Sequence, residues 1–312
     1  LNLEDLGFGI SLLDTTFQRP DMAACYIIED DGEVAIIETG TKDTVPLILT
    51  SLLQQGLSLS QVKYVVVTHI HLDHAGGAGR LMIELPNATL VVHEKGARHM
   101  VDPSKLQAAA TAVYGKAEFD KTYGDLLPID ESRITVPKDE GQLTLGGRTL
   151  TFLDTPGHAN HHFCIHDSIS NGFFTGDTFG LAYRELTSDK GPFIFPTTTP
   201  VQFNPEALKN SIQRMIDRNP DRMFLTHYGM VENPKNLAEI LIPQVDELVD
   251  MALGLKDEDN RLQKLNDTMM SWLMERLKDW NLDLSEDEIK NVIRSDTFLN
   301  AQGLDVWLSK AN

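Results

Sequence analysis

The sequence is poor in cysteine. Its 312 residues include only two cysteines, Cys25 and Cys164, which lie far apart and have no metal-ligand spacing. We therefore expect no disulfide and two small apolar side chains, as is typical of proteins from a reduced compartment.

Long apolar runs are also missing. No stretch approaches the roughly 20 residues that a membrane-spanning helix needs, and the first residues, Leu1 to Asp5, lack the basic start and apolar core of a signal peptide. We expect a cytoplasmic location and no membrane partner.

Basic residues are few relative to acidic ones. Lys and Arg number 27 against 46 Asp and Glu, which gives a formal charge of −19 without a basic cluster. A polyanion would be repelled by most of such a surface, so nucleic acid is not an expected partner and a small-molecule substrate is favoured. The charge itself is chiefly a source of solubility.

The first two hundred or so residues alternate between short β-like runs and helical spacing. Strands are predicted over 9–13, 24–29, 34–38, 62–67, 89–93, 149–153, 172–175 and 223–225. Helices are predicted over 45–55, 78–85 and 96–101. This order favours an α/β fold, and a 41% hydrophobic content supports a substantial core.

The densest group of chemically active residues follows the apolar run 65–67. It reads Thr-His-Ile-His-Leu-Asp-His-Ala-Gly-Gly from Thr68 to Gly77 and holds three imidazoles and a carboxylate within six residues. A strand that leads into a glycine-containing turn can place several of these groups around one point. The pattern therefore predicts a metal site.

Other predicted strands end at further candidate ligands. His158, Asp177 and His227 each follow an apolar strand, as His69 does. Strand ends at one edge of a sandwich meet in space although they are distant in sequence, so we expect these groups to converge.

Seven candidate ligands suffice for two ions. If His69, His71 and His158 hold one ion and Asp73, His74 and His227 the other, Asp177 remains to bridge them with its two oxygens. A water between two such ions would have its pKa lowered to roughly 7 and would supply a hydroxide nucleophile, while a metal polarises the bond under attack. The predicted chemistry is metal-assisted hydrolysis. Two divalent ions are expected as cofactors, with Zn²⁺ favoured and Fe or Mn as alternatives.

These motifs resemble those of the metallo-β-lactamase superfamily, which includes glyoxalase II, the acyl-homoserine lactonases and the flavodiiron proteins. The resemblance covers roughly residues 10 to 230. The matching motifs, in order, are His-x-His-x-Asp-His at 69–74, Gly-His at 157–158, Gly-Asp at 176–177 and Thr-His at 226–227. It implies a four-layer αβ/βα sandwich over residues 1–233, the ligand division given above, and a catalytic role for Asp73 in orienting the nucleophilic water.

The chain departs from the family pattern at a few positions. Glu38 stands where the family usually has Asp, and it is expected to support the ligands without binding metal. His162 aligns with a histidine of the lactonase-like members and has a similar expected role, whereas His161 replaces a glycine and inherits none. His71 stands where flavodiiron proteins typically have Glu, which argues against their redox chemistry without excluding iron.

Two tyrosines are candidate substrate-binding residues. Tyr183 and Tyr228 lie just beyond Asp177 and His227, where a phenol can donate a hydrogen bond to a developing oxyanion, as the resemblance to lactonases suggests. Packing in the core or at its rim is an equally good reading for both.

Residues 234–312 are predicted to form a C-terminal helical subdomain. Helical spacing covers 237–253 and about 260–280, a capping box at Ser285 to Glu288 predicts a third helix, and a short one is expected over 299–309. Packing or homodimerisation is the expected role of this region.

The sequence thus predicts a binuclear metal-dependent hydrolase of a small ester, thioester or lactone. A di-iron protein of the same fold that binds or senses oxygen is one alternative, and a phosphodiesterase is another.

Overall fold

The computed structural model of the chain describes residues 2–199 and 201–310, with the side chains of residues 113 and 114 left out. The chain divides into two compact units. Unit 1 comprises Leu1–Asp154 and His161–Gly176, and unit 2 comprises Thr155–Asn160 and Asp177–Asn312.

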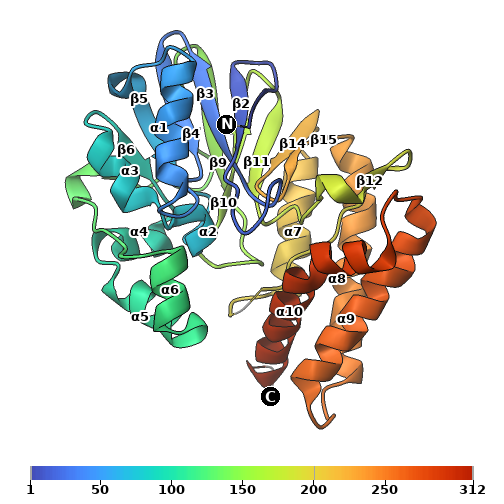
Figure 1. The fold of residues 1–312 in the computed structure, drawn as a ribbon. Helices are drawn as coiled ribbons and strands as arrows, with labels where there is room; N and C mark the ends of the chain where they lie inside the picture. The colour runs from blue at the N-terminus through green and yellow to red at the C-terminus, as the bar shows by residue number, and fades with distance from the viewer. Residues whose placement is uncertain (1, 200, 311–312) are drawn as a thin grey trace. The chain divides into compact units, whose positions relative to one another are not determined.

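Unit 1 contains a seven-stranded sheet in chain order (Figure 1). Its strands are β1 (Leu3–Asp5), β2 (Ile10–Asp14), β3 (Ala24–Asp30), β4 (Glu33–Ile37), β5 (Val62–Val66), β6 (Thr89–Val91) and β7 (Ile134–Thr135). Neighbouring strands from β1 to β4 are antiparallel, and those from β4 to β7 are parallel. Asp31 and Gly32 both have positive φ, 49° and 78°, as the tight turn of the antiparallel β3–β4 hairpin requires.

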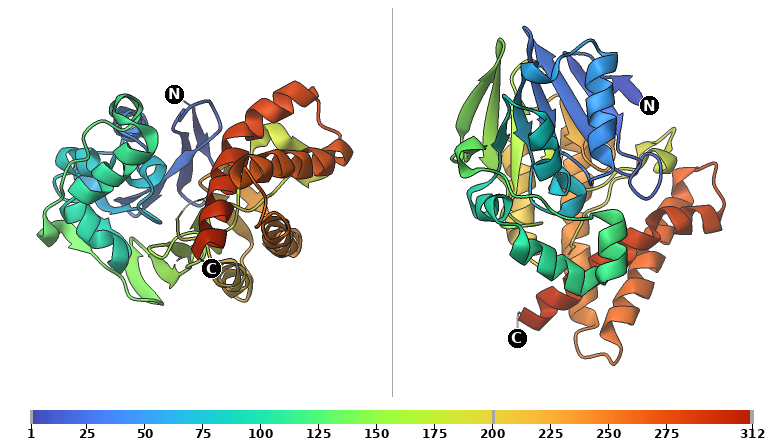
Figure 2. Two further views of the ribbon diagram at one scale, coloured as in Figure 1. Left: turned by 90° about the horizontal axis from the view of Figure 1, so that it is seen from below. Right: turned by 60° about the vertical axis from the view of Figure 1, so that its left-hand side comes forward.

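Helices α1 (Thr44–Gln54) and α3 (Ala78–Glu84) lie along one face of this sheet (Figures 1 and 2). Ile48 and Leu52 of α1 and Leu81 of α3 belong to one buried apolar cluster with Val65 of β5. Burial of this stripe, at about 25 cal/mol per Å² of apolar surface, holds the helices on the sheet. The remaining helices of unit 1 are α2 (Leu72–Ala75), α4 (Glu94–Val101), α5 (Ser104–Tyr114) and α6 (Lys116–Thr122), with the short 3₁₀ turns η1 (Leu59–Gln61) and η2 (Glu131–Arg133).

Four antiparallel strands form a second sheet within unit 1. They are β8 (Gly141–Leu145), β9 (Arg148–Asp154), β10 (Phe163–Asp167) and β11 (Gly172–Gly176), paired in chain order. Tyr26 of β3 packs edge-on against Phe174 of β11, with 5.2 Å between ring centroids. The two sheets of unit 1 therefore face each other.

Unit 2 contains the hairpin β14 (Arg222–Leu225) and β15 (Gly229–Glu232), the small hairpin β12 (Thr187–Ser188) and β13 (Gly191–Pro192), the 3₁₀ turns η3 (Arg184–Leu186) and η4 (Lys278–Trp280), and four helices. The helices are α7 (Pro205–Ile216), α8 (Pro234–Gly254), α9 (Arg261–Leu277) and α10 (Glu286–Lys310). Helix α8 packs against α7, and α9 and α10 pack against each other and against α8 (Figure 2). Position 234, the predicted start of the helical subdomain, is the first residue of α8; the proposed domain boundary there stays a prediction.

One expectation for this region is wrong. The third helix and the short helix over 299–309 are a single continuous helix, α10. Its predicted capping box is present, because the backbone N–H of Ser285 donates to Glu288 at 2.8 Å and the N–H of Glu288 donates to the Ser285 hydroxyl at 3.4 Å.

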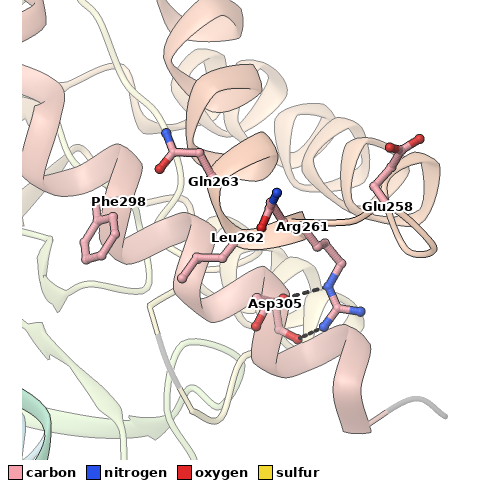
Figure 3. Close-up of a pocket in the computed structure, with 7 residues that line it drawn as sticks. Glu258, Arg261, Leu262, Gln263, Phe298 and Asp305 are labelled. Atoms are coloured by element: carbon pink, nitrogen blue, oxygen red, sulfur yellow. Dashed lines mark hydrogen bonds and ion pairs between the residues drawn. The ribbon is translucent and has the colours of Figure 1, made fainter.

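A pocket of about 430 Å³ lies between the start of α9 and α10 (Figure 3). Arg261 and Asp305 form an ion pair beside it, with 2.6 Å between Nε and Oδ1. None of the predicted site residues lines this pocket. Among the described residues, no helix combines the length and apolar character that crossing a bilayer requires.

Candidate metal centre

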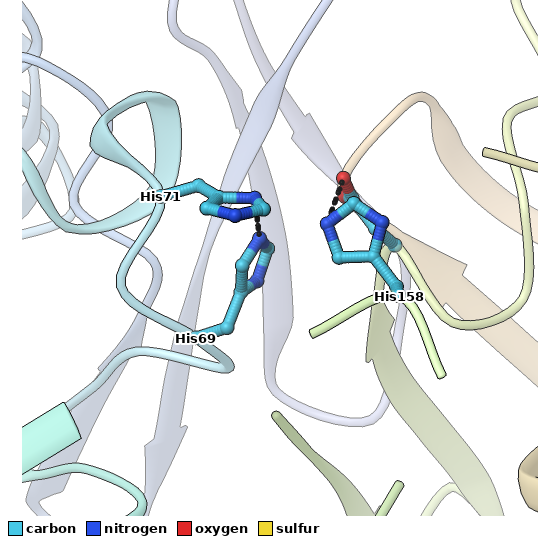
Figure 4. A group of neighbouring side chains, drawn as sticks. His69, His71 and His158 are labelled. Atoms are coloured by element: carbon cyan, nitrogen blue, oxygen red, sulfur yellow. Dashed lines mark hydrogen bonds and ion pairs between the residues drawn. The ribbon is translucent and has the colours of Figure 1, made fainter. Parts of the chain in front are cut away.

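Unit 1 gathers four of the predicted ligands at the end of β5. His69 and His71 lie in the turn after the strand, and Asp73 and His74 lie on the one-turn helix α2. Nε2 of His69 is 2.9 Å from Nδ1 of His71 (Figure 4). Nε2 of His74 is 3.5 Å from Oδ2 of Asp73. The rings of His69 and His74 are 4.0 Å apart between centroids.

Gly77 allows this turn to press against the loop that follows β4. A Cβ added at Gly77 would lie only 2.7 Å from the carbonyl oxygen of Thr39, so no larger residue fits there without movement. The Gly77 N–H donates to the Gly40 carbonyl at 2.8 Å, and the Thr39 N–H donates to the His74 carbonyl at 2.8 Å. The backbone of His74, a predicted ligand, is thereby fixed to the 38–40 loop.

Glu38 contacts one predicted ligand, His74, and Thr68, the neighbour of another. It adopts a φ of 66°, which is rare for a residue with a side chain, and it is 1% exposed. The Thr68 hydroxyl donates to Oε1 at 2.5 Å, and Nδ1 of His74 lies 3.1 Å from the same oxygen. Burial raises the pKa of the nearby Cys25 thiol well above its usual value, and the charge of Glu38 raises it further. Cys25 and Cys164 are both buried thiols.

These contacts determine which nitrogen of each histidine can bind a metal. His74 donates from Nδ1 to Glu38, so its lone pair lies on Nε2. Thr68 gives its only hydroxyl proton to Glu38 and therefore accepts from Nδ1 of His69, 3.1 Å away. The lone pair of His69 then also lies on Nε2. One carboxylate sets the tautomers of two predicted ligands.

His162 is fully buried beside the cluster. Its ring stacks on that of His69, with 4.8 Å between centroids and 26° between planes. A Cβ at Gly176 would lie 2.4 Å from Oγ1 of Thr68 and 2.5 Å from Nε2 of His162, so this position needs glycine, which also has a positive φ of 49°. His162 thus packs directly against the ring of a predicted ligand.

Unit 2 gathers the other three predicted ligands. Nε2 of His158 lies 3.4 Å from Oδ2 of Asp177, and Nε2 of His227 lies 3.7 Å from Oδ1 of the same carboxylate. Figure 4 shows His158 with its dashed contact. The two oxygens of Asp177 each face a different imidazole, as a carboxylate that is shared between two ions would.

Local packing explains the positions of His158 and His227. Gly157, with a φ of 135°, lies so close to α7 that a Cβ there would be 2.3 Å from the backbone of Leu208. The backbone N–H of Ala182 donates to the His227 carbonyl at 2.6 Å and holds the turn after β14. Both histidines are at most 5% exposed.

The two candidate tyrosines are buried in unit 2. The Tyr183 hydroxyl donates its proton to Oδ1 of Asp296 in α10 at 3.0 Å. It can donate to a substrate oxygen only if it leaves Asp296, since a phenol has one proton. The guanidinium of Arg184 lies over the Tyr228 ring, 4.6 Å from its centroid. Both substrate roles remain predictions.

Sequence reasoning missed the polar face of α10. The Asn300 side chain accepts from the Thr198 N–H at 2.7 Å and donates to the Pro196 carbonyl at 3.3 Å, and a Cβ at Gly303 would lie 1.4 Å from the Thr198 carbonyl oxygen. Thr199, the next residue, has its hydroxyl 3.4 Å from Nδ1 of His158. The helix therefore holds a segment that contacts a predicted ligand.

The side chains in each unit suit divalent metal ions. Imidazole and carboxylate are the ligand types that Zn²⁺ and related ions prefer, and a catalytic ion needs about three of them. The fixed Nε2 lone pairs of His69 and His74, and the two oxygens of Asp177 directed at different histidines, fit this requirement.

Comparison with known proteins identifies the family. A model of the metallo-beta-lactamase superfamily matches residues 19–227. The chain belongs to this superfamily, which confirms the predicted family and the α/β fold class with C-terminal helices.

Individual relatives agree with this assignment. A metallo-beta-lactamase fold-containing protein of Sulfurisphaera tokodaii is 25% identical over 226 residues, 71% of this chain and 78% of that protein. The N-acyl homoserine lactonase AttM of Agrobacterium fabrum is 33% identical over 107 residues, 34% of this chain and 36% of that protein. The structure of a metallo-beta-lactamase family protein from Thermus thermophilus has a TM-score of 0.68 at 20% identity and covers 98% of this chain and 95% of that one, so it shares the fold.

Proposed function

We propose that the protein is a binuclear metal-dependent hydrolase of small esters, thioesters or lactones. In this proposal one ion is held by His69, His71, His158 and Asp177. The second is held by Asp73, His74 and His227, with Asp177 bridging the two. Zn²⁺ is the proposed metal, with Fe or Mn as alternatives.

The observation that carries the proposal is the position of the Asp177 carboxylate. Its two oxygens lie 3.4 Å and 3.7 Å from the Nε2 atoms of His158 and His227, which belong to different proposed sites. A group that served one ion would have no reason to face both histidines. When bound, two divalent ions would supply a water of lowered pKa and a Lewis acid for the substrate oxygen.

Residues of the chain then organise the reaction around the ions. Asp73 is half-buried and keeps one oxygen 3.5 Å from Nε2 of His74, so we assign it the orientation of the attacking water in addition to ligation. Glu38 maintains the ligand tautomers of His69 and His74, and His162 supports the ring of His69.

The choice of substrate class follows from charge and similarity. The formal charge of −19 disfavours polyanions such as nucleic acids and favours a small-molecule substrate. The partial similarity to a homoserine lactonase supports an ester-type bond. Tyr183 and Tyr228 are both proposed for the substrate-binding role, and Tyr183 would have to leave Asp296 to donate its proton to a substrate. A cytoplasmic location and dimerisation through the helices stay predictions.

Metal analysis combined with a substrate panel tests the proposal. We expect protein purified without oxygen to contain two divalent ions per chain and to hydrolyse a member of a panel of acyl lactones and thioesters. Removal of the metal by a chelator should abolish turnover, and added Zn²⁺ should restore it.

Two outcomes would favour the alternatives. Two irons with an oxygen-sensitive visible absorption, without turnover of the panel, would indicate an oxygen-binding or sensing protein. Turnover of bis(p-nitrophenyl) phosphate at a rate above that of every ester would indicate a phosphodiesterase.

A further inference from the structure

His161 lies beside the predicted ligands of unit 1 and has no role in the metal centre proposed above. Its Nδ1 accepts a hydrogen bond from the backbone N–H of Ile70, the residue between His69 and His71, at 3.4 Å. Its ring is nearly parallel to that of His69 and perpendicular to that of His71, with centroid distances of 6.2 Å and 5.6 Å. The imidazole is therefore held next to the proposed site of the first ion.

The bond to Ile70 determines the tautomer of His161. A backbone N–H can only donate, so Nδ1 must carry the lone pair and the ring proton must lie on Nε2. The outer nitrogen of the ring is consequently a hydrogen-bond donor, whereas the Nε2 atoms of His69 and His74 are acceptors. A donor of this kind suits an oxygen of a substrate better than it suits a metal ion.

Two further observations separate His161 from the ligands. Among residues 2–199 and 201–310, two groups of side chains have possible metal-ligating atoms within 4.8 Å of one another. Neither group includes His161. It is half-buried, whereas His69 and His162 are fully buried. Its ring therefore lies at the border between the cluster and solvent, where a substrate arrives.

We propose that His161 is a substrate-contacting residue that donates a hydrogen bond from Nε2 to an oxygen of the bound ester or lactone, or of the carboxylate product. This proposal rests on the proposed hydrolase function. The donor is neutral and involves no proton transfer. Loss of one such bond to a partly charged oxygen corresponds to roughly a 10-fold loss of affinity or of kcat/KM.

Two substitutions isolate the Nε2 donor. In His161→Asn the side-chain oxygen can still accept from Ile70, but nothing replaces Nε2. In His161→Gln the longer amide places an N–H near the position of Nε2. We expect kcat/KM for the preferred lactone or thioester to fall roughly 10-fold in His161→Asn and to stay within roughly 3-fold of the starting value in His161→Gln. The matched control is His99→Asn, on α4, which should have no effect.

A binding measurement provides a readout that does not depend on turnover. Calorimetric titration of the Zn²⁺-loaded protein with hexanoate, a simple carboxylate product, should give a Kd about 10-fold weaker for His161→Asn than for the unsubstituted protein and for His161→Gln. Metal content and Tm should be the same in all of them, since His161 holds no ion.

Several results would overturn the proposal. Equal hexanoate affinity in His161→Asn and the unsubstituted protein would exclude the contact, and an equal loss in His161→Gln would show that the ring matters and the donor does not. Loss of metal in His161→Asn would assign the residue to the metal centre instead. If the unsubstituted protein binds hexanoate but hydrolyses none of the panel, the proposed function fails while the titration still decides the role of His161; if it does neither, both fail.

Discussion

Replacement of Glu38 by glutamine should weaken metal binding without changing any ligand. Glutamate accepts from the Thr68 N–H, the Thr68 hydroxyl and Nδ1 of His74, but glutamine has a single acceptor oxygen. If its NH₂ takes the place of Oε2, it faces the N–H of Thr68. If it takes the place of Oε1, His74 must move its proton to Nε2, the atom that binds the metal.

The size of the effect follows from these contacts. Loss of a hydrogen-bonding partner that orients a ligand typically costs 10- to 100-fold in metal affinity, about 1.4 to 2.7 kcal/mol. A buried donor left without an acceptor costs about 1 to 3 kcal/mol of folding stability even in the metal-free protein. We therefore expect a metal Kd raised 10- to 100-fold and a metal-free Tm lowered by roughly 2 to 10 °C.

Competition with a chromophoric chelator measures the Zn²⁺ affinity, and thermal unfolding in excess chelator measures the metal-free Tm. Glu84→Gln, which removes the same charge from an exposed position on α3, is the control and should change neither value. A Glu38→Gln protein with unchanged Zn²⁺ affinity would refute the argument that this carboxylate sets the tautomers of His69 and His74.

Three further predictions concern other parts of the chain. Asp177→Ala should lose at least one of two metals on gel filtration, because two cations would lose their shared anion; retention of both would contradict the bridging assignment. Gly303→Ala should lower stability by about 1 to 3 kcal/mol or more in urea unfolding, since its Cβ would meet the Thr198 carbonyl at 1.4 Å, and an unchanged midpoint would count against that packing. The pKa of Glu33 is held below its ordinary value, chiefly by the hydrogen bond that Lys63 donates to its carboxylate. Its stabilisation is thus full above about pH 4.3 and is lost as the pH falls through the lowered pKa. Because both groups are partly exposed, Lys63→Met should cost less than about 1 kcal/mol at pH 7, measured by urea unfolding, with a smaller difference at pH 3.

Hydrophobic periodicity predicted β2 to β6, β9, β11 and β14 and the helices α1, α3 and α4, because these elements bury a regular apolar face. The strand at 62–67 and the helix at 45–55 agree with β5 and α1 to within a residue at each end. Strands β8 and β10 were not predicted. Strand β8 has polar residues between its apolar ones and has one fully buried position, and β10 ends in His166 and Asp167. Neither strand therefore has a plain apolar pattern.

The sequence predicted two helices where the structure has the single helix α10, and this error has a specific physical cause. Its middle carries Asp296, Thr297, Asn300 and Gly303, which are weak helix formers and interrupt the apolar stripe. Asp296 and Asn300 hydrogen-bond to Tyr183 and to the 196–198 segment, and Gly303 lies against that segment. These residues therefore serve tertiary contacts, although the local sequence pattern predicts the end of a helix at their position.

In the candidate site, spacing identified the ligand types but not the contacts that orient them. The six-residue motif and the later strand ends indicate imidazole and carboxylate ligands, and this inference needs no knowledge of the surrounding residues. The hydrogen bond from Ile70 to His161 joins residues 91 positions apart, and no local signal marks it. The contact between Glu38 and His74 is of the same kind.

The bonds between α10 and the 196–198 segment limit how this protein can be recombined with its relatives. Asn300 and Gly303 fit one backbone path of that segment, through three hydrogen bonds at Asn300 and one close approach at Gly303. A C-terminal helix that carries other residues at these two positions would not make these contacts with the segment. In a chimera of this protein and a relative, α10 and residues 196–199 should therefore come from the same parent protein.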